Sequence, residues 1–245
     1  AKAKAPCMSI MNMPPLPYLK RIPSLEGTPL EDAFTDASIW NPFDPKLMTL
    51  CSPDPQAFRP PEEGPNVLHV GLPTNFKVSK FHDAKLDAML SELETGIQNF
   101  KIDGKDVPVK LRVFDSLFVP FAKWSMLATG NYRCITADGP RSIQEAVHGD
   151  PEKSEEIYNY VSDLVVRLGA DIEDMVPFEK YANAAKSLLK PSSAARAVYS
   201  GAKNIERVDK LIQLAGTAVG MQHPSIDETV AIVDAKLAQN RNADG

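Results

Sequence analysis

Hydrophobic and polar positions follow two different patterns along the 245 residues of this chain. In the first part, short apolar runs bounded by proline, glycine or asparagine predict β-strands. These runs are Cys7–Met11, Lys46–Cys51, Val67–Leu72 and Phe76–Phe81. From about residue 112 the apolar positions recur every three or four residues, which predicts amphipathic helices instead.

Proline and glycine support this division of the chain. Fourteen of the 21 prolines lie in residues 1–73, and proline disfavours helix interiors. Asp103-Gly104, between Phe100–Ile102 and Val107–Leu111, predicts a hairpin turn. Helices are predicted near residues 84–99, 113–131, 141–148, 151–168, 178–189, 204–220 and 225–240.

Several of these helices carry signals at their ends. Asp150-Pro151 is typical of an N-cap followed by proline in the first helical position. Ser225 and Glu228 have the spacing of a capping box. Glycines at 149, 169 and 220 stand where helices are expected to stop.

Composition narrows the possible functions. Hydrophobic residues make up 43% of the chain and charged residues 24%, as in ordinary globular proteins. The formal charge of −5 argues against nucleic acid and membrane surfaces as partners, because both require a basic face. We find no signal peptide and no apolar run long enough to cross a membrane, so a cytoplasmic protein is expected.

The cysteines indicate neither a disulfide framework nor a metal site. Cys7, Cys51 and Cys134 are odd in number and widely spaced, and no CxxC or Cys/His ligand spacing occurs. They are expected to be buried free thiols in a reducing cytoplasm.

One lysine lies within an apolar stretch, Phe121–Asn131 (FAKWSMLATGN). On a regular helix Lys123 and Asn131 share one broad face, about 80° apart and about 12 Å apart along the axis. Lys123 either extends its ammonium group from a half-buried helix to water, which is common, or serves as a proton donor or anion anchor. The pattern alone leaves both interpretations open.

A second polar cluster lies in the segment KPSSAARAVYSGAKNIERVDKLIQ. Ser192 and Ser193 stand at a predicted helix start, where a hydroxyl caps the helix or helps to hold a carboxylate. Glu206 opens the next predicted helix, where a carboxylate is favoured by the helix dipole. The nearby cations are expected to be solvated: Arg196, Lys203 and Arg207.

Taken together, these segments resemble the ketopantoate reductase (2-dehydropantoate 2-reductase) family. The Lys123–Asn131 helix, the K-P-S-S segment, Gly201 and the I-E-R-x-D start are similar to its C-terminal domain. SIMNMPPLPYL and VLHVGLPTNFKVSKF look like the end of its dinucleotide-binding fold, and GMQHPSIDETVAIVDAKL like its terminal helix. The resemblance extends over most of the chain.

The resemblance implies a site for reducing a 2-oxo acid with NADP or NAD. Lys123 would be the general acid, and Glu206 would bind the substrate hydroxyl and tune the lysine. Asn131 would orient the substrate, and Ser193 would hold its carboxylate. Asn12 would stand at the junction of cofactor and substrate.

The chain departs from the family pattern in several places. Leu127 stands where the family often has asparagine, and Met13–Pro15 follows Asn12 in place of glycine. The interval Gly201–Glu206 is one residue longer, and the proline-rich segment Trp40–Pro61 has no clear counterpart. These differences suggest a substrate that is bulkier or less polar than ketopantoate.

A glycine-rich phosphate-binding loop is not found in this sequence, and the family would place it before residue 1. We therefore expect the 245 residues alone to bind NAD(P)H poorly and to be inactive, which a fluorescence titration would test.

The expected architecture is mixed. Residues 1–111 would form short β-strands, the remnant of an α/β dinucleotide-binding fold, and residues 112–245 a mostly helical domain for substrate binding and homodimer formation. Two alternatives are an opine-type dehydrogenase and a helical binding or dimerisation module without activity. An opine-type site would use a histidine proton relay, and all four histidines lie outside the Lys123–Asn131 helix.

Overall fold

The computed structural model describes residues 4–53, 57–58, 63–64, 67, 69–71 and 73–243. The chain divides into two compact units. The sheet unit comprises Ala1–Ile22 and Ser38–Pro120, and the helical unit comprises Pro23–Ala37 and Phe121–Gly245. The predicted boundary between the dinucleotide-binding region and the helical domain, after residue 111, differs from this division, which also groups Pro23–Ala37 with the helical unit.

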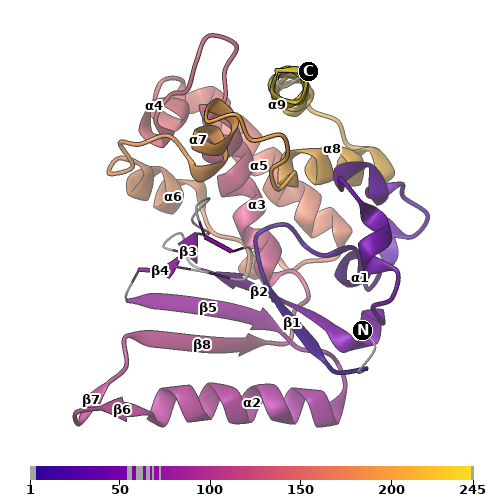
Figure 1. The fold of residues 1–245 in the computed structure, drawn as a ribbon, viewed down its shortest axis with the longest axis vertical. Helices are drawn as coiled ribbons and strands as arrows, with labels where there is room; N and C mark the ends of the chain where they lie inside the picture. Colours follow the sequence, from indigo (N-terminus) through magenta and orange to yellow (C-terminus); the bar gives the residue numbers. More distant parts are fainter. Residues whose placement is uncertain are drawn as a thin grey trace. The chain divides into compact units, whose positions relative to one another are not determined.

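The sheet unit is built on four strands in the order β1-β2-β5-β8 (Figure 1). β1 (Cys7–Ile10) is parallel to β2 (Met48–Pro53), β2 is antiparallel to β5 (Thr74–Ser79), and β5 is parallel to β8 (Val109–Phe114). α2 (Ala84–Asn99) connects β5 to β8 and packs along β8, as Figure 1 shows. The core between them contains Cys51, Val78, Phe81, Leu90 and Leu111.

Shorter elements complete this unit. α1 (Leu16–Leu19) is fully buried, and the Tyr18 hydroxyl donates to the carbonyl oxygen of Leu117 (2.7 Å). η3 (Ala37–Trp40), η4 (Pro45–Leu47) and the pair β3 (Ala57–Phe58) and β4 (His69–Val70) lie in the connections. Parts of the expected strand Val67–Leu72 and of the segment Trp40–Pro61 lie outside the described residues.

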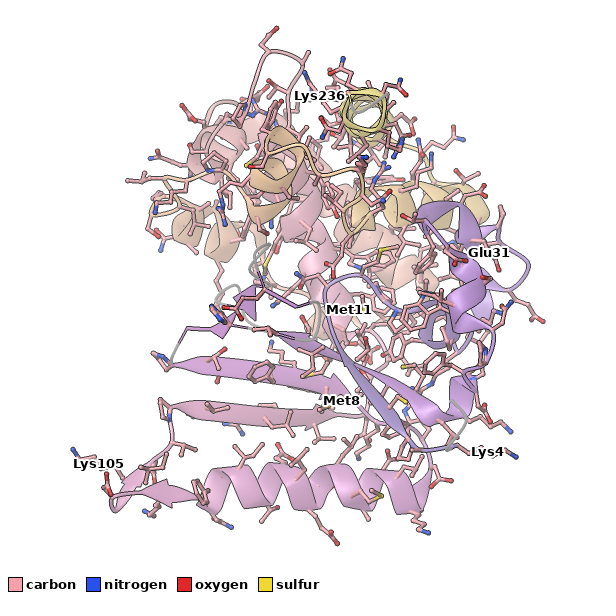
Figure 2. The ribbon with its side chains drawn as sticks, in the orientation of Figure 1. Lys4, Met8, Met11, Glu31, Lys105 and Lys236 are labelled. Carbon is pink, nitrogen blue, oxygen red and sulfur yellow. The ribbon has the colours of Figure 1, made fainter. Side chains whose placement is uncertain are left out.

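The hairpin predicted at Asp103-Gly104 is confirmed. β6 (Lys101–Ile102) pairs with β7 (Lys105–Asp106), and Figure 2 shows Lys105 at this hairpin. Asp103 and Gly104 have φ values of 51° and 75°, as a two-residue turn with the twist of a hairpin requires.

The helix expected over residues 113–131 is wrong in its first half. Val113 and Phe114 instead extend β8, where they pair with Val78 and Ser79. Pro120 lies within a 3-10 turn, η5 (Val119–Phe121), and the α-helix begins only after it, at Ala122. Long-range strand pairing therefore outweighs the helical spacing of these residues.

The helical unit contains most of the helices. They are α3 (Ala122–Met126), η6 (Leu127–Asn131), η7 (Tyr132–Cys134), α4 (Ile143–His148), α5 (Pro151–Leu168), η8 (Ile172–Asp174), α6 (Phe178–Ala185), α7 (Ser193–Tyr199), α8 (Val208–Ala218) and α9 (Pro224–Asn242). Two 3-10 turns from early in the chain, η1 (Pro23–Leu25) and η2 (Leu30–Ala33), pack against α8. The Ser24 hydroxyl also donates to the carbonyl oxygen of Leu168 at the end of α5 (2.8 Å).

The helix ends test the predicted signals. Asp150 caps α5 by accepting from the backbone N–H of Lys153 (3.0 Å), which confirms that prediction. The capping box predicted at Ser225 is wrong, because α9 begins one residue earlier and His223 Nδ1 accepts from the Ser225 N–H (3.2 Å). A capping box does occur at α4, between Ser142 and Glu145.

The expected fold class, short strands followed by a mostly helical part, is confirmed. Cys51 and Cys134 are buried free thiols, as expected, whereas Cys7 is only half-buried. Within the described part of the chain, no helix combines the length and hydrophobicity needed to cross a bilayer. Nor do three His, Cys, Asp or Glu side chains of that part gather where a metal ion would fit.

Candidate functional site

The helix that carries Lys123 and Asn131 is irregular. It begins as α3, whose residue Lys123 is half-buried, and continues as the π-helical turn η6 (Leu127–Asn131). The backbone N–H of Tyr132 bonds to the carbonyl oxygen of Leu127, five residues back in place of four. Such single π turns within helices are rare and are frequent at functional sites.

The π turn is stabilised by a contact from α6. The Tyr181 hydroxyl donates to the carbonyl oxygen of Met126 (3.1 Å), which in a regular helix would accept from residue 130. Residue 130 is glycine, and a Cβ atom there would overlap the Tyr181 hydroxyl oxygen. Gly130 thus leaves the space through which Tyr181 reaches the backbone.

The wider turn changes how Lys123 and Asn131 are arranged. Eight residues of a regular α-helix leave the two positions about 80° apart around the axis. A π turn takes up about one additional residue, so the same eight residues complete close to two turns and the offset falls to about 20°. Lys123 and Asn131 are therefore more closely in line than a regular helix predicts.

Tyr132 connects this helix to the segment that contains Glu206. Its hydroxyl donates to the carbonyl oxygen of Glu206 and accepts from the backbone N–H of Val208 (3.0 Å). Burial raises the pKa of Tyr132 well above its ordinary value, and the charges of Asp209 and Glu206 add to the effect. The hydroxyl therefore stays protonated, and the half-buried Glu206 is held by its backbone.

Ser192 connects the same helix to the K-P-S-S segment. Its hydroxyl donates to the carbonyl oxygen of Asn131 (2.7 Å) and accepts from the backbone N–H of Ala195 (3.1 Å), so it caps α7. Ser193 is exposed, and its hydroxyl has no partner among the described residues. The carboxamide of Asn131 is half-buried and likewise makes no hydrogen bond to a described residue.

These contacts bring together three segments that are far apart in the sequence: Lys123–Asn131, Ser192-Ser193 and Glu206. Two of the predicted site residues, Asn131 and Ser193, have a fixed backbone and a polar side chain that is not engaged elsewhere. Each of these residues therefore can contribute a hydrogen-bonding group to a ligand.

The segment after Glu206 is fixed by a buried ion-pair network. Arg207 donates to both carboxylate oxygens of Asp209 (3.0 Å each) and to Asp234 of α9 (2.5 Å). The Arg207 side chain is 12% exposed and that of Asp209 is 2% exposed. Burial alone would lower the pKa of Arg207, but the carboxylates of Asp209 and Asp234 raise it. The expectation that Arg207 is a solvated cation is therefore wrong.

α9 also fixes the end of α7. The side-chain amide of Asn240 donates to the carbonyl oxygens of Val198 (2.7 Å) and Ala202 (2.9 Å). Lys236, labelled in Figure 2, donates to the carbonyl oxygen of Ala137 (2.9 Å) and lies 5.7 Å from the ring centre of Tyr199. The terminal helix thus supports the segments that carry the predicted site residues.

Asn12 lies in the sheet unit, two residues beyond the carboxyl end of β1. Its side chain is half-buried, and its Oδ1 atom is buried without a hydrogen-bond partner among the described residues. Buried acceptors are nearly always satisfied in native structures, so this oxygen calls for a donor. Ligands of α/β sheets bind beyond the carboxyl ends of the strands, where Asn12 lies.

The histidines of the helical unit have structural contacts. His148 bonds to the carbonyl oxygen of Ala182 (2.9 Å), and His223 caps α9 with its Nε2 3.2 Å from Glu156. Neither lies on the helix that carries Lys123.

Sequence reasoning missed the residues that support the site. Tyr132 contacts the backbone of Glu206, Tyr181 contacts the backbone of Met126 beside the π turn, and Asp209 binds Arg207 next to Glu206. None of the three was singled out. The sequence does show a tyrosine next to Asn131 and an acidic residue two positions after Arg207. It does not show the contacts of Tyr132 and Tyr181, because their partners lie 50 or more residues away.

No protein-family model and no curated protein matches the sequence at a significant level. Solved structures do match. A candidate ketopantoate reductase from Ralstonia solanacearum MolK2 aligns with a TM-score of 0.62 at 13% identity, covering 96% of this chain and 68% of that one. D-mandelate dehydrogenase in complex with NADH and anilino(oxo)acetate aligns with a TM-score of 0.58 at 14% identity, covering 83% of this chain.

A second structure of D-mandelate dehydrogenase, in complex with NADH, aligns with a TM-score of 0.53 at 16% identity. This chain covers only 65% of the D-mandelate dehydrogenase chain in the ternary complex. At such identities the likeness establishes the fold alone: the chain has a fold related to these dehydrogenases.

Proposed function

We propose that this chain is the substrate-binding and dimerising part of an NAD(P)H-dependent oxidoreductase of ketopantoate-reductase type. The reaction would be reversible hydride transfer between the nicotinamide and the carbonyl carbon of a 2-oxo acid. The convergence of the Lys123–Asn131 helix with the Ser192-Ser193 and Glu206 segments carries this proposal. The related fold of the dehydrogenases supports it.

Lys123 is proposed to protonate the alkoxide that forms as the ketone is reduced. A cation suits this role, because it stabilises the developing negative charge before it gives up its proton. Lys123 is half-buried on α3, so its ammonium group is not fully surrounded by water. Glu206 is proposed to bind the substrate hydroxyl and to tune Lys123.

Asn131 and Ser193 are proposed to orient the substrate. The carboxamide of Asn131 offers both a donor and an acceptor, and the exposed Ser193 hydroxyl offers a donor to a carboxylate. Ser192 is less suited to this role, since its hydroxyl already binds Asn131 and Ala195. This is why we assign the substrate carboxylate to Ser193.

Asn12 is proposed to contact the cofactor where it meets the substrate. Its unpaired buried Oδ1 fits a ligand with an N–H donor, such as the carboxamide of a nicotinamide. The nicotinamide, when bound, supplies or accepts the hydride. The residues of this chain bind and orient the substrate and move the proton.

The proposal is tested with the intact protein that contains this chain. A panel of 2-oxo acids is offered with NADH or NADPH, and cofactor oxidation is followed by absorbance. Lys123→Ala is expected to lower kcat by roughly a hundredfold or more, because general acid catalysis contributes on that order. Lys123→Arg keeps the charge but hardly releases a proton, so it should be nearly as slow.

Two outcomes would contradict the proposal. One is an intact protein that oxidises neither cofactor with any 2-oxo acid, which would favour a binding or dimerisation module. The other is a Lys123→Ala variant with the turnover of the unmodified protein. The proposed homodimer is examined separately by sedimentation, and a monomer at micromolar concentration would count against it.

A further inference from the structure

We infer that Tyr181 and Gly130 together set the π turn of η6, and that this turn aligns Lys123 and Asn131 for proton transfer. Tyr181 is thus a positioning residue that acts through the helix backbone. The catalytic part of this inference rests on the proposed function. The structural part, that Tyr181 and Gly130 maintain the π turn, stands independently of it.

The first step is that the π turn needs an outside partner. An isolated π turn is less favourable than continued α-helix, so it persists only where its surroundings maintain it. Tyr181 provides such a contact, since its hydroxyl donates to Met126 at the residue before the turn (3.1 Å). No side chain at position 130 blocks the approach.

The second step is that Tyr181 is itself rigidly held. It is 7% exposed and stacks on Tyr158 of α5, with ring centres 5.5 Å apart and an angle of 21° between the planes. The Tyr158 hydroxyl donates to the carbonyl oxygen of Val176 (2.8 Å), a contact that involves neither Tyr181 nor the π turn. Burial raises the pKa of Tyr181, so its hydroxyl keeps the proton that it donates.

The third step is that the turn sets the rotation of everything after it. Asn131 is the last residue of the wider turn and Tyr132 follows it, and their contacts lead to Ser192 and to Glu206. If the turn closed to regular α-helix, both residues would rotate by about 100° around the helix axis relative to Lys123. The proposed acid and the proposed substrate ligand Asn131 would then lie about 80° apart around the axis in place of about 20°.

The test compares Tyr181→Phe with Tyr158→Phe in the intact protein. Each variant removes one hydroxyl from the same aromatic cluster, but only Tyr181 touches the π turn. We expect Tyr181→Phe to lower kcat for 2-oxo acid reduction by about tenfold to a hundredfold, as small misplacements of reacting groups do, with unchanged cofactor Kd. Tyr158→Phe is expected to keep the kcat of the unmodified protein, although its Tm should fall as much as that of Tyr181→Phe.

A second variant disturbs the same contact at the helix instead of at Tyr181. Gly130→Ala places a methyl group on the Tyr181 hydroxyl and should reduce kcat at least as much as Tyr181→Phe. Because both changes disturb one contact, the double variant Gly130→Ala/Tyr181→Phe should lose less activity than the product of the two single losses. Independent, multiplicative losses would overturn the inference.

A readout without activity separates this inference from the proposed function. Amide hydrogen exchange over residues 127–132 should speed up in Tyr181→Phe, while exchange in α5 stays unchanged. Unchanged exchange over residues 127–132 would overturn the structural part whatever the reaction is. If Lys123→Ala keeps full turnover, the proposed function fails even where the exchange result holds. If Tyr181→Phe keeps full kcat while Lys123→Ala loses it, the positioning role fails alone.

Discussion

α5 and the α3–η6 helix pack against each other in the helical unit, yet they are specified in different ways. α5 carries its own end signals, with Asp150 as N-cap and Gly169, at a φ of 125°, as its stop. The α3–η6 helix has no side-chain cap at its start, and its π turn is contacted by Tyr181 of α6. Its last residue, Asn131, is held by Ser192, and Tyr132 after it is held by the Glu206 segment.

The difference shows which helices are determined by local sequence alone. A regular helix with local caps has the same ends in almost any surroundings, because each signal acts within a few residues. An irregular helix depends on partners that are distant in the sequence, and its geometry changes when one of them changes. We expect substitutions at the contacts of the α3–η6 helix to affect the candidate site, and substitutions at the caps of α5 to affect stability alone.

The largest effect is expected at the ion-pair network beside the Glu206 segment. Asp209→Ala removes one of the carboxylates that bind the buried Arg207 and leaves its contact with Asp234, and breaking a buried pair in this way costs about 3–5 kcal/mol. Urea denaturation measures the free energy of unfolding. Asp209→Asn keeps the side-chain shape and one acceptor, so it should lose less. A loss below about 1 kcal/mol in Asp209→Ala would mean that the network contributes little.

An intermediate effect on stability is expected at Tyr132. Tyr132→Phe leaves the backbone N–H of Val208 and the carbonyl oxygen of Glu206 without this partner, which costs about 1–3 kcal/mol. It should also reduce turnover of the intact protein, because Glu206 loses its backbone anchor. Thermal unfolding and steady-state kinetics measure the two effects.

Asp150→Ala is the matched control from α5. It removes a local N-cap and is expected to cost about 1 kcal/mol without changing kcat. If Asp150→Ala slows turnover as much as Tyr132→Phe, the two helices do not differ in the way that we describe.

The smallest effect is a pH dependence at the capping box of α4. The backbone N–H of Ser142 donates to Glu145 (2.7 Å) and, with the Ser142 hydroxyl, lowers the pKa of that carboxyl below its ordinary value of 4.5. A lowered pKa in the folded state means that this stabilisation is complete above pH 4.5 and is lost as the pH falls through the lower value. The difference in unfolding free energy between the protein and Glu145→Gln should therefore shrink below pH 4.5. A difference that stays constant from pH 7 to pH 3 would contradict this.

Much of the fold could be predicted from local signals. The bounds of α2 and α5 match the predicted ranges, and each helix has an aspartate N-cap directly before it. The hairpin at Asp103-Gly104 also follows from two residues that accept positive φ. Residues 113–114 could not be predicted in this way, because their strand pairing with β5 depends on a partner 35 residues earlier. The grouping of residues 23–37 with the helical unit depends on packing against α8, which no local pattern shows.

The sequence predicted residues of the candidate site, but not the contacts that hold their segments in place. The resemblance pointed to Lys123, Asn131 and Glu206, and their roles stay predictions. Ser192 and Tyr132 bond to the backbones of Asn131 and Glu206, and Tyr181 bonds to the backbone of Met126 between Lys123 and Asn131, all across long sequence distances. A side chain that bonds to the backbone of a distant segment produces no periodic pattern in the sequence around it.

The π turn also affects how this chain is aligned with others. A helix that holds one additional residue in a single turn equals a straight helix with a one-residue insertion. Counting positions from Lys123 without a gap would pair Asn131 and every later residue of the helix with the wrong counterpart in a relative whose helix is straight. An alignment that opens a gap within residues 127–131 keeps equivalent side chains together.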